Sequence, residues 1–216
     1  RPVIAPSRLG FLLTDAAKLE RNFVITADDP AGPWSDPVWL DFGGIDPSLF
    51  FDADGKAWIV YNDAPPGEPQ YEGHRALWLQ QFDPGAMTVL PGRTLLVDGG
   101  VDPSTKPIWA EGPHIYKIGD WFYLLIAEGG TERGHAVTVA RSKSISGPFE
   151  FDPKSPLLSN RGTGLTLQNT GHADLVQRAD GSWAMVFHGT RPKGSSPEWH
   201  SLGRETCAVE IEWRDG

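Results

Sequence analysis

Three segments of this chain repeat one pattern, in which a short strand-like run, a turn containing Asp and Gly, and an apolar aromatic run follow each other. The turn pairs are Asp54-Gly55, Gly119-Asp120 and Asp180-Gly181. Each segment opens with an ionisable residue eight positions before its turn pair: Asp46, Glu111 and His172. Because such a pair between aromatic and β-branched runs is a strong hairpin signal, the sequence predicts three copies of a β-hairpin.

The spacing of the copies extends this pattern to a larger repeat. The hairpins begin 65 and 61 residues apart, and further strand-like runs at 22–27 and 135–140 each lead into a Gly-Pro turn. A repeat of about 60 residues thus holds four antiparallel strands, which is the blade of a β-propeller. A shortened copy at residues 5–13 opens the chain. We therefore predict an all-β fold, a single β-propeller domain over residues 1–216 with about four four-stranded blades.

Composition excludes several classes of protein. The chain has 216 residues with 39% hydrophobic residues and a formal net charge of −9, and no run of Lys or Arg, so a nucleic-acid partner is not expected. No stretch of about 18 apolar residues exists, so no membrane span is expected. The single cysteine, Cys207, excludes an internal disulfide and a cysteine metal cage. No leader-like segment is found, which favours a cytoplasmic location, with secretion as the alternative.

Repeat equivalence predicts a functional site. Equivalent positions on the innermost strands of a propeller surround its axis, so Asp46, Glu111 and His172 are expected to converge, with Ala5 at the fourth position. The alternative is that each is a turn-capping or solvated loop residue. Two carboxylates at one pocket are typical of glycoside hydrolysis, in which an acid protonates the leaving oxygen. Glu111 lies in an apolar setting beside Trp109 that favours a protonated acid.

Several long motifs resemble glycoside hydrolase family 43, most closely its β-xylosidases and α-L-arabinofuranosidases. The resemblance covers almost the whole chain from Asn22 onward. It is carried by Asp46-Pro47-Ser48-Leu49-Phe50-Phe51, Ala110-Glu111-Gly112-Pro113-His114, Gly134-His135-Ala136-Val137-Thr138-Val139-Ala140-Arg141-Ser142 and Gly171-His172-Ala173-Asp174-Leu175-Val176.

The resemblance implies a five-bladed propeller that hydrolyses xylan- or arabinan-derived oligosaccharides with inversion and requires no cofactor. It implies Glu111 as the general acid and Asp46 as the aspartate that orients and tunes it. His172 is expected near the central channel, where family members often hold a calcium ion or water. The residues expected to contact the sugar or line the pocket are Trp109, Glu128, Thr131, His135, His172 and Arg191.

The chain also departs from the family pattern at its N-terminal end. The family's general base lies in an Asp-Pro motif of the first blade, and nothing before Ala5 matches that motif, so the chain resembles a truncated family member. Among the nearby acidic residues, Asp15 is the least improbable substitute for the base. Three readings stay open: an active glycosidase, a propeller that binds sugar without hydrolysing it, and a homo-oligomer in which a second chain completes the site.

Overall fold

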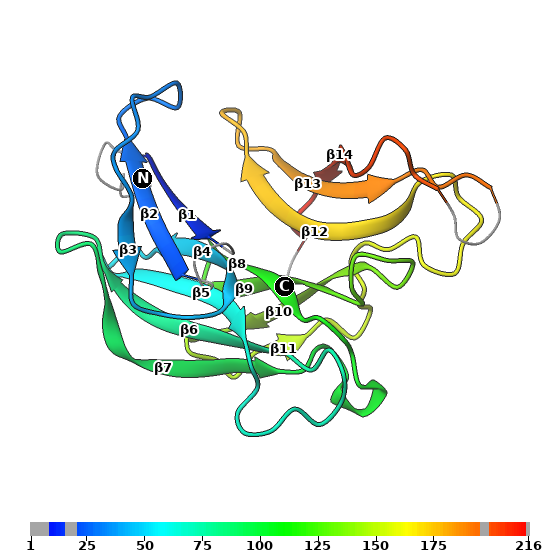
Figure 1. Ribbon diagram of the computed structural model, residues 1–216, viewed down its shortest axis with the longest axis horizontal. Helices are drawn as coiled ribbons and strands as arrows, with labels where there is room; N and C mark the ends of the chain where they lie inside the picture. The colour runs from blue at the N-terminus through cyan, green and yellow to red at the C-terminus, as the bar shows by residue number, and fades with distance from the viewer. Residues whose placement is uncertain (1–8, 16–20, 195–198, 215–216) are drawn as a thin grey trace.

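The computed structural model describes residues 9–15, 21–194 and 199–214, and its strands form four antiparallel sheets (Figure 1). The first sheet contains β1 (Leu9–Asp15), β2 (Arg21–Ala27) and β3 (Val38–Leu40). The second contains β4 (Ile45–Phe51), β5 (Ala57–Asp63), β6 (Ala76–Asp83) and β7 (Thr88–Asp98). The third contains β8 (Glu111–Ile118), β9 (Trp121–Glu128), β10 (Ala136–Ser142) and β11 (Glu150–Phe151). The fourth contains β12 (Gln168–Gln177), β13 (Trp183–Thr190) and β14 (Glu205–Ile211).

Each sheet has the strand order of its chain, as expected for a blade, and each predicted hairpin is confirmed. The helical part of the described chain is one 3-10 turn, Pro103–Thr105. No helix among the described residues is long and apolar enough to cross a membrane. Ala5, the fourth position expected around the axis, lies outside the described residues.

The innermost strands of three blades share a β-bulge close to the axis. The pairing register shifts between Ile45 and Ser48 in β4, between Glu111 and His114 in β8, and between Gly171 and Asp174 in β12. A bulge inserts an unpaired residue and redirects the side chains beside it. This shared irregularity, rather than regular strand geometry, sets which side chains face the axis.

The bulges correct the expected equivalence of Asp46, Glu111 and His172. The residues with positive φ at the three bulges are Asp46 (φ 52°), Gly112 (φ 54°) and His172 (φ 49°), so Glu111 is offset by one position from the other two. The distance from the ionisable residue to the turn pair is nevertheless eight residues in all three segments. This is because the second hairpin has a tighter turn, with Ile118 paired directly to Trp121. Left-handed backbone at non-glycine residues such as Asp46 and His172 is uncommon and is concentrated at functional sites.

Three hydrophobic clusters join neighbouring sheets in chain order. The first sheet packs on the second around Leu40 and Ile59, and the third packs on the fourth around Leu125 and Met185. Phe50 of β4 meets Phe122 of β9 edge-on at 6.0 Å between the second and third sheets. None of these three clusters contains residues from both the first and the last sheet. In Figure 1 these two sheets, blue and yellow to red, stand at opposite ends of the arc.

The junction of the second and third sheets predicts a large effect on stability. Leu124 of β9 is fully buried in this cluster, so Leu124→Ala removes apolar contacts and leaves a cavity. We expect the free energy of unfolding, measured by urea titration, to fall by about 2–5 kcal/mol. The control is Leu202→Ala, because Leu202 is 77% exposed and its truncation is expected to cost under about 0.5 kcal/mol. Equal losses for both variants would contradict this packing.

Candidate active site

A cleft of about 480 Å³ lies at one end of the blades. Its floor contains Asp46 from β4, Glu111 from β8 and His172 from β12. One ligand-type atom of each of these three side chains lies within 4.8 Å of those of the other two. The structure therefore brings together three ionisable residues that are widely separated in the chain.

Asp46 is held by hydrogen bonds from two different blades. Its Oδ2 accepts one bond from Asn62 Nδ2 (3.1 Å) and one from the backbone amide of Gly112 (3.2 Å). Arg75 donates through Nε (3.0 Å) and Nη2 (2.8 Å) to Asn62 Oδ1, which turns the amide nitrogen of Asn62 toward Asp46. These hydrogen bonds fix the Asp46 carboxylate beside the strand that carries Glu111.

Burial raises the pKa of Asp46 above its usual range, and four neighbouring groups modify this effect. His172 and Arg75 favour the ionised carboxylate, whereas Glu111 opposes it. The Gly112 amide also favours the ionised form, because it donates to the carboxylate. Asp46 is therefore a half-buried carboxylate whose charge depends on the groups around it.

His172 and Glu111 form a close pair in the floor of the cleft. His172 Nδ1 lies 3.8 Å from Glu111 Oε1, which is an ion-pair contact rather than a hydrogen bond. The interaction with Glu111 raises the pKa of His172, while burial opposes this effect. The Glu111 side chain is only 13% exposed, and it lines the cleft.

An aromatic rim flanks the cleft. Trp109 lines it and is 41% exposed, with its backbone amide donating to Gly73 O at 2.8 Å. Gly73 is required there, because a Cβ atom at this position would lie 2.9 Å from Ile108. Thr131 lines the same cleft from the loop between β9 and β10. An exposed indole beside carboxylates suits the apolar face of a sugar ring.

The structure corrects the expected position of Arg191. This residue forms an ion pair with Glu205 and is not among the residues that line the cleft, whereas Arg204 lines it. Both arginines flank the connection between β13 and β14, so they lie near the same end of the blade. Glu205 is the first residue of β14 and binds Arg191, which leaves Arg204 as the arginine of the cleft.

Two further residues expected in the pocket lie behind its wall. Glu128 is 7% exposed and its Oε2 accepts a hydrogen bond from the backbone amide of Val101 at 3.2 Å. His135 is 1% exposed, and burial lowers its pKa. His188, whose ring centroid lies 4.9 Å from that of His135, also has its pKa lowered, mainly by burial, to about 4. These imidazoles form a layer beneath the cleft.

Some cleft residues were not predicted from the sequence. Arg204, Glu132 and Ile108 line the cleft, and Asn62 and Arg75 support Asp46 from behind. Arg204 directly precedes β14, at the end of the blade where the site was expected, and this position in the sequence could have identified it. Asn62 and Arg75 have no comparable signal, because only the fold shows that the end of β5 faces Asp46.

The calcium ion that the resemblance implies near His172 would find few protein ligands there. Calcium takes 6–8 oxygen ligands. Asp46 Oδ2 already accepts two N–H groups, and on its other side His172 faces the nitrogen atoms of His135 and His188. The described neighbours of His172 therefore offer few free protein oxygen atoms, so a calcium ion there would depend mostly on water ligands.

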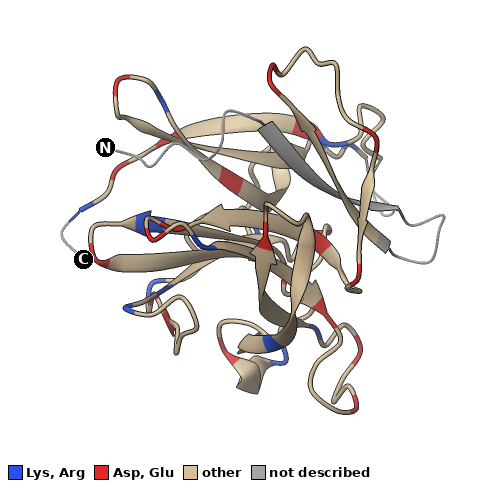
Figure 2. Cartoon of the chain, turned by 90° about the vertical axis from the view of Figure 1, so that its left-hand side faces the viewer, with Lys and Arg blue, Asp and Glu red and all other residues tan. Residues whose placement is uncertain are grey.

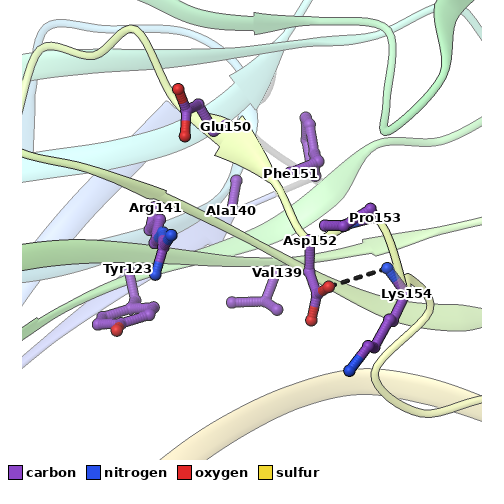
Figure 3. A pocket seen from close by; sticks show the side chains of 9 residues that line it. All are labelled: Tyr123, Val139, Ala140, Arg141, Glu150, Phe151, Asp152, Pro153 and Lys154. Carbon is purple, nitrogen blue, oxygen red and sulfur yellow. Dashed lines mark hydrogen bonds between the residues drawn. The ribbon is translucent and has the colours of Figure 1, made fainter. Parts of the chain in front are cut away.

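A second cavity, of about 290 Å³, lies beside β9, β10 and β11 (Figure 3). It contains two carboxylates, but Figure 3 shows Glu150 and Asp152 pointing in different directions. Asp152 Oδ1 accepts a hydrogen bond from the Lys154 backbone amide at 2.8 Å. Because its carboxylates do not converge, this cavity is a weaker candidate than the cleft for acid-base chemistry.

The hydrogen bonds from Arg75 through Asn62 to Asp46 predict a change in the pH dependence of kcat/KM. In Arg75→Met, Asp46 loses a positive charge that lowers its pKa, and Asn62 loses the partner that orients it. The pKa of Asp46 then rises further, so its ionised form is reached only at higher pH. We expect the acid limb of kcat/KM to move to higher pH, with a roughly tenfold lower rate below it, since a hydrogen bond to a charged group contributes about 1.5–3 kcal/mol.

The matched control for this prediction is Arg93→Met. Arg93 stacks on Trp78 at 3.9 Å and pairs with Asp63, and it does not line the cleft. An unshifted acid limb in Arg75→Met, or an equal shift in both variants, would show that Arg75 does not act through Asp46.

Comparisons with known proteins agree with this geometry. The sequence profile of the glycosyl hydrolases family 43 matches residues 11–216. A xylosidase/arabinosidase of Butyrivibrio fibrisolvens is 41% identical over 212 residues, and a non-reducing end α-L-arabinofuranosidase of Bacteroides ovatus is 40% identical over 192 residues. These alignments cover 95% and 88% of this chain, but 40% and 33% of the two relatives.

A solved structure shows the same fold. The crystal structure of a GH43_12 protein retrieved from a capybara gut metagenome matches with a TM-score of 0.89 at 39% sequence identity. The match covers 97% of this chain and 38% of that protein. The chain thus spans less than half the length of each of these three proteins.

Proposed function

Because the chain belongs to glycosyl hydrolase family 43, we propose that it hydrolyses glycosidic bonds and releases xylose or arabinose from xylan- or arabinan-derived oligosaccharides with inversion. The observation that carries this proposal is the meeting of Asp46 and Glu111, from two blades, in one cleft beside an exposed tryptophan. Paired carboxylates are the usual machinery for this reaction.

In this proposal Glu111 is the general acid. Its proton passes to the oxygen of the leaving sugar as the bond from that oxygen to the anomeric carbon breaks. Asp46 keeps its charge beside Glu111 and orients it, while His172 Nδ1 lies 3.8 Å from Oε1 of the Glu111 carboxyl group. Trp109 and Arg204 hold the sugar, through ring stacking and through hydrogen bonds to its hydroxyl groups respectively.

Inversion also requires a base on the opposite face of the sugar ring. A water molecule attacks the anomeric carbon there and gives its proton to that base, whose carboxylate stands about 6.5–9.5 Å from the acid. Among the described cleft residues, the remaining carboxylate is Glu132, which is exposed on the loop between β9 and β10. Asp15 ends β1, and its side chain lies outside the described part.

The charge of the surface agrees with a neutral ligand. In the view of Figure 2, Lys and Arg stand at separate places among Asp and Glu rather than in one stripe. A neutral oligosaccharide needs no field of a single sign for its recognition, because hydrogen bonds and ring stacking select it.

Hydrolysis of nitrophenyl β-xyloside and nitrophenyl α-L-arabinofuranoside tests the proposal, with the configuration of the released sugar followed by NMR. We expect turnover of at least one substrate, an inverted product, and loss of most turnover of xylobiose in Glu111→Gln. Turnover of xylobiose that persists undiminished in Glu111→Gln, or a product of retained configuration, would overturn it. Binding of xylo-oligosaccharide without any turnover would instead support a sugar-binding propeller.

We further propose that the chain works as a homo-oligomer. The outward faces of the two terminal sheets carry apolar side chains, including Val176, which is 47% exposed, and the half-buried pair Phe23 and Trp39. A stable contact over such faces is expected to bury more than about 1,000 Å². Light scattering after size exclusion measures the mass, and a monomer at micromolar concentration would contradict this proposal.

A further inference from the structure

Residues 107–109 lie just before β8 and carry two side chains of the cleft, those of Ile108 and Trp109. The backbone of Trp109 has φ 55°. Left-handed backbone is rare for so large a residue, and it persists only where the surrounding structure holds it. One such contact is the hydrogen bond from the Gly129 backbone amide to Ile108 O, at 2.8 Å. The position of Trp109 in the cleft therefore depends on other parts of the chain.

The loop between β5 and β6, residues 64–75, contacts both ends of this segment. The Trp109 backbone amide donates a hydrogen bond to Gly73 O at 2.8 Å. At the other end, the hydroxyl group of Tyr71 donates to Pro107 O at 2.9 Å. The loop thus holds the tryptophan through one backbone bond and one side-chain bond.

His74 holds the loop itself in place. Its ring stacks on that of Tyr71, with centroids 4.5 Å apart and an angle of 20° between the rings. The Gln70 backbone amide lies 3.2 Å from His74 Nδ1 and can only donate, so Nδ1 accepts and Nε2 carries the proton. Nε2 then donates to Asp98 Oδ1 at 2.9 Å. Both nitrogens of this ring, which is 5% exposed, are therefore used to fix the loop.

We propose that Tyr71 and His74 are positioning residues for the sugar, which act by holding Trp109 in its left-handed conformation. This inference rests on the proposed function, in which Trp109 stacks on the sugar. The next residue, Arg75, acts instead on Asp46 through the side chain of Asn62. Two adjacent residues before β6 thus support two different parts of the reaction, the binding of sugar and the charge beside the acid.

Fluorine NMR tests the positioning of Trp109 without any sugar. The chain has nine tryptophans, which are labelled as 5-fluorotryptophan, and Trp109→Phe identifies the Trp109 resonance by its loss. Tyr71→Phe keeps the aromatic ring and removes only the hydroxyl group that donates to Pro107. We expect this variant to shift or broaden the Trp109 resonance more than any other tryptophan resonance. A Trp109 resonance that does not change would overturn the proposal.

The matched control is Tyr61→Phe. Tyr61 lies in the same sheet, its hydroxyl group bonds to Gln80 Oε1 at 3.0 Å, and its side chain does not line the cleft. This variant also loses one hydrogen bond of a tyrosine hydroxyl group, but we expect it to leave the Trp109 resonance and the KM for xylobiose unchanged. Equal effects of both variants would show a general loss of packing rather than positioning by Tyr71.

Hydrolysis of xylobiose then tests the consequence for binding. We expect Tyr71→Phe to raise KM about two- to tenfold, which corresponds to the loss of one neutral hydrogen bond. Both kcat and the acid limb of the pH profile are expected to stay as in the unaltered chain, in contrast to Arg75→Met. In a chain that already carries Trp109→Ala, Tyr71→Phe is expected to have no further effect on KM, because the residue it acts through is gone.

A fall in kcat with KM unchanged, or an equal rise in KM with and without Trp109, would overturn the proposal. If the unaltered chain neither hydrolyses nor binds xylobiose, the proposed function fails. The fluorine resonance of Trp109 then decides separately whether Tyr71 positions it.

Discussion

Glu111→Gln is expected to lower kcat for xylobiose by about 10²–10⁴-fold, which is the usual contribution of general acid catalysis. The amide keeps the size of the side chain and its contact with His172, but it has no proton to give to the leaving oxygen. Steady-state hydrolysis of xylobiose by the variant and the unaltered chain measures the effect. KM is expected to change little, because the loss concerns only the transition state.

The identity of the leaving group separates this role from a structural one. Nitrophenolate leaves without full protonation, so Glu111→Gln is expected to lose much less activity on nitrophenyl xyloside than on xylobiose. The matched control is Glu150→Gln, because Glu150 lines the other cavity and not the cleft. Equal losses on both substrates would mean that Glu111 supports the fold or the binding of sugar rather than the transfer of a proton.

Most of the fold follows from local signals. The turns at Asp54 and Gly181, with alternating apolar runs around them, predict hairpins because turn chemistry and side-chain alternation act over a few residues. The repeat then extends each hairpin to a blade: the second and third sheets have the four predicted strands, whereas the first and fourth have three strands among the described residues. The one-residue offset of Glu111 from Asp46 and His172 could not be predicted. Its different position at the bulge and the tighter turn of its hairpin cancel, so the spacing to the turn is the same in all three segments.

The site depends on contacts between blades, and these are harder to predict. Asp46 and Glu111 were recognisable because the repeat and their motifs coincide. Arg191 was predicted to contact the sugar, but in the structure it pairs with Glu205, and Arg204, which the sequence did not single out, lines the cleft. Asn62 lies in a strand with no motif around it, and only its hydrogen bond to Asp46 in the structure shows that it supports the site. Such contacts arise from tertiary packing and leave no local pattern.

The second large expected effect concerns the carboxylate that activates the attacking water. If no carboxylate is placed to activate water, hydrolysis is slowed by about another 10²–10⁴-fold, and a small anion that needs no deprotonation is expected to replace water. Sodium azide is therefore expected to accelerate turnover of nitrophenyl xyloside by the unaltered chain by about 10²-fold. The azide nitrogen bonds to the anomeric carbon as nitrophenolate leaves, so the product is a glycosyl azide of inverted configuration.

Variants identify the base if azide has no effect on the unaltered chain. Asp15→Asn and Glu132→Gln each remove one acidic residue near the cleft or the N-terminal end, and the variant that lacks the base is expected to become slow and to respond to azide. If neither variant responds while turnover is fast, the carboxylate belongs to a second copy of the chain. In that case the rate per chain must fall on dilution, because the subunits that share the site separate. A rate that is fast, independent of concentration and unaffected by azide in all three proteins would contradict an inverting reaction with Glu111 as its acid.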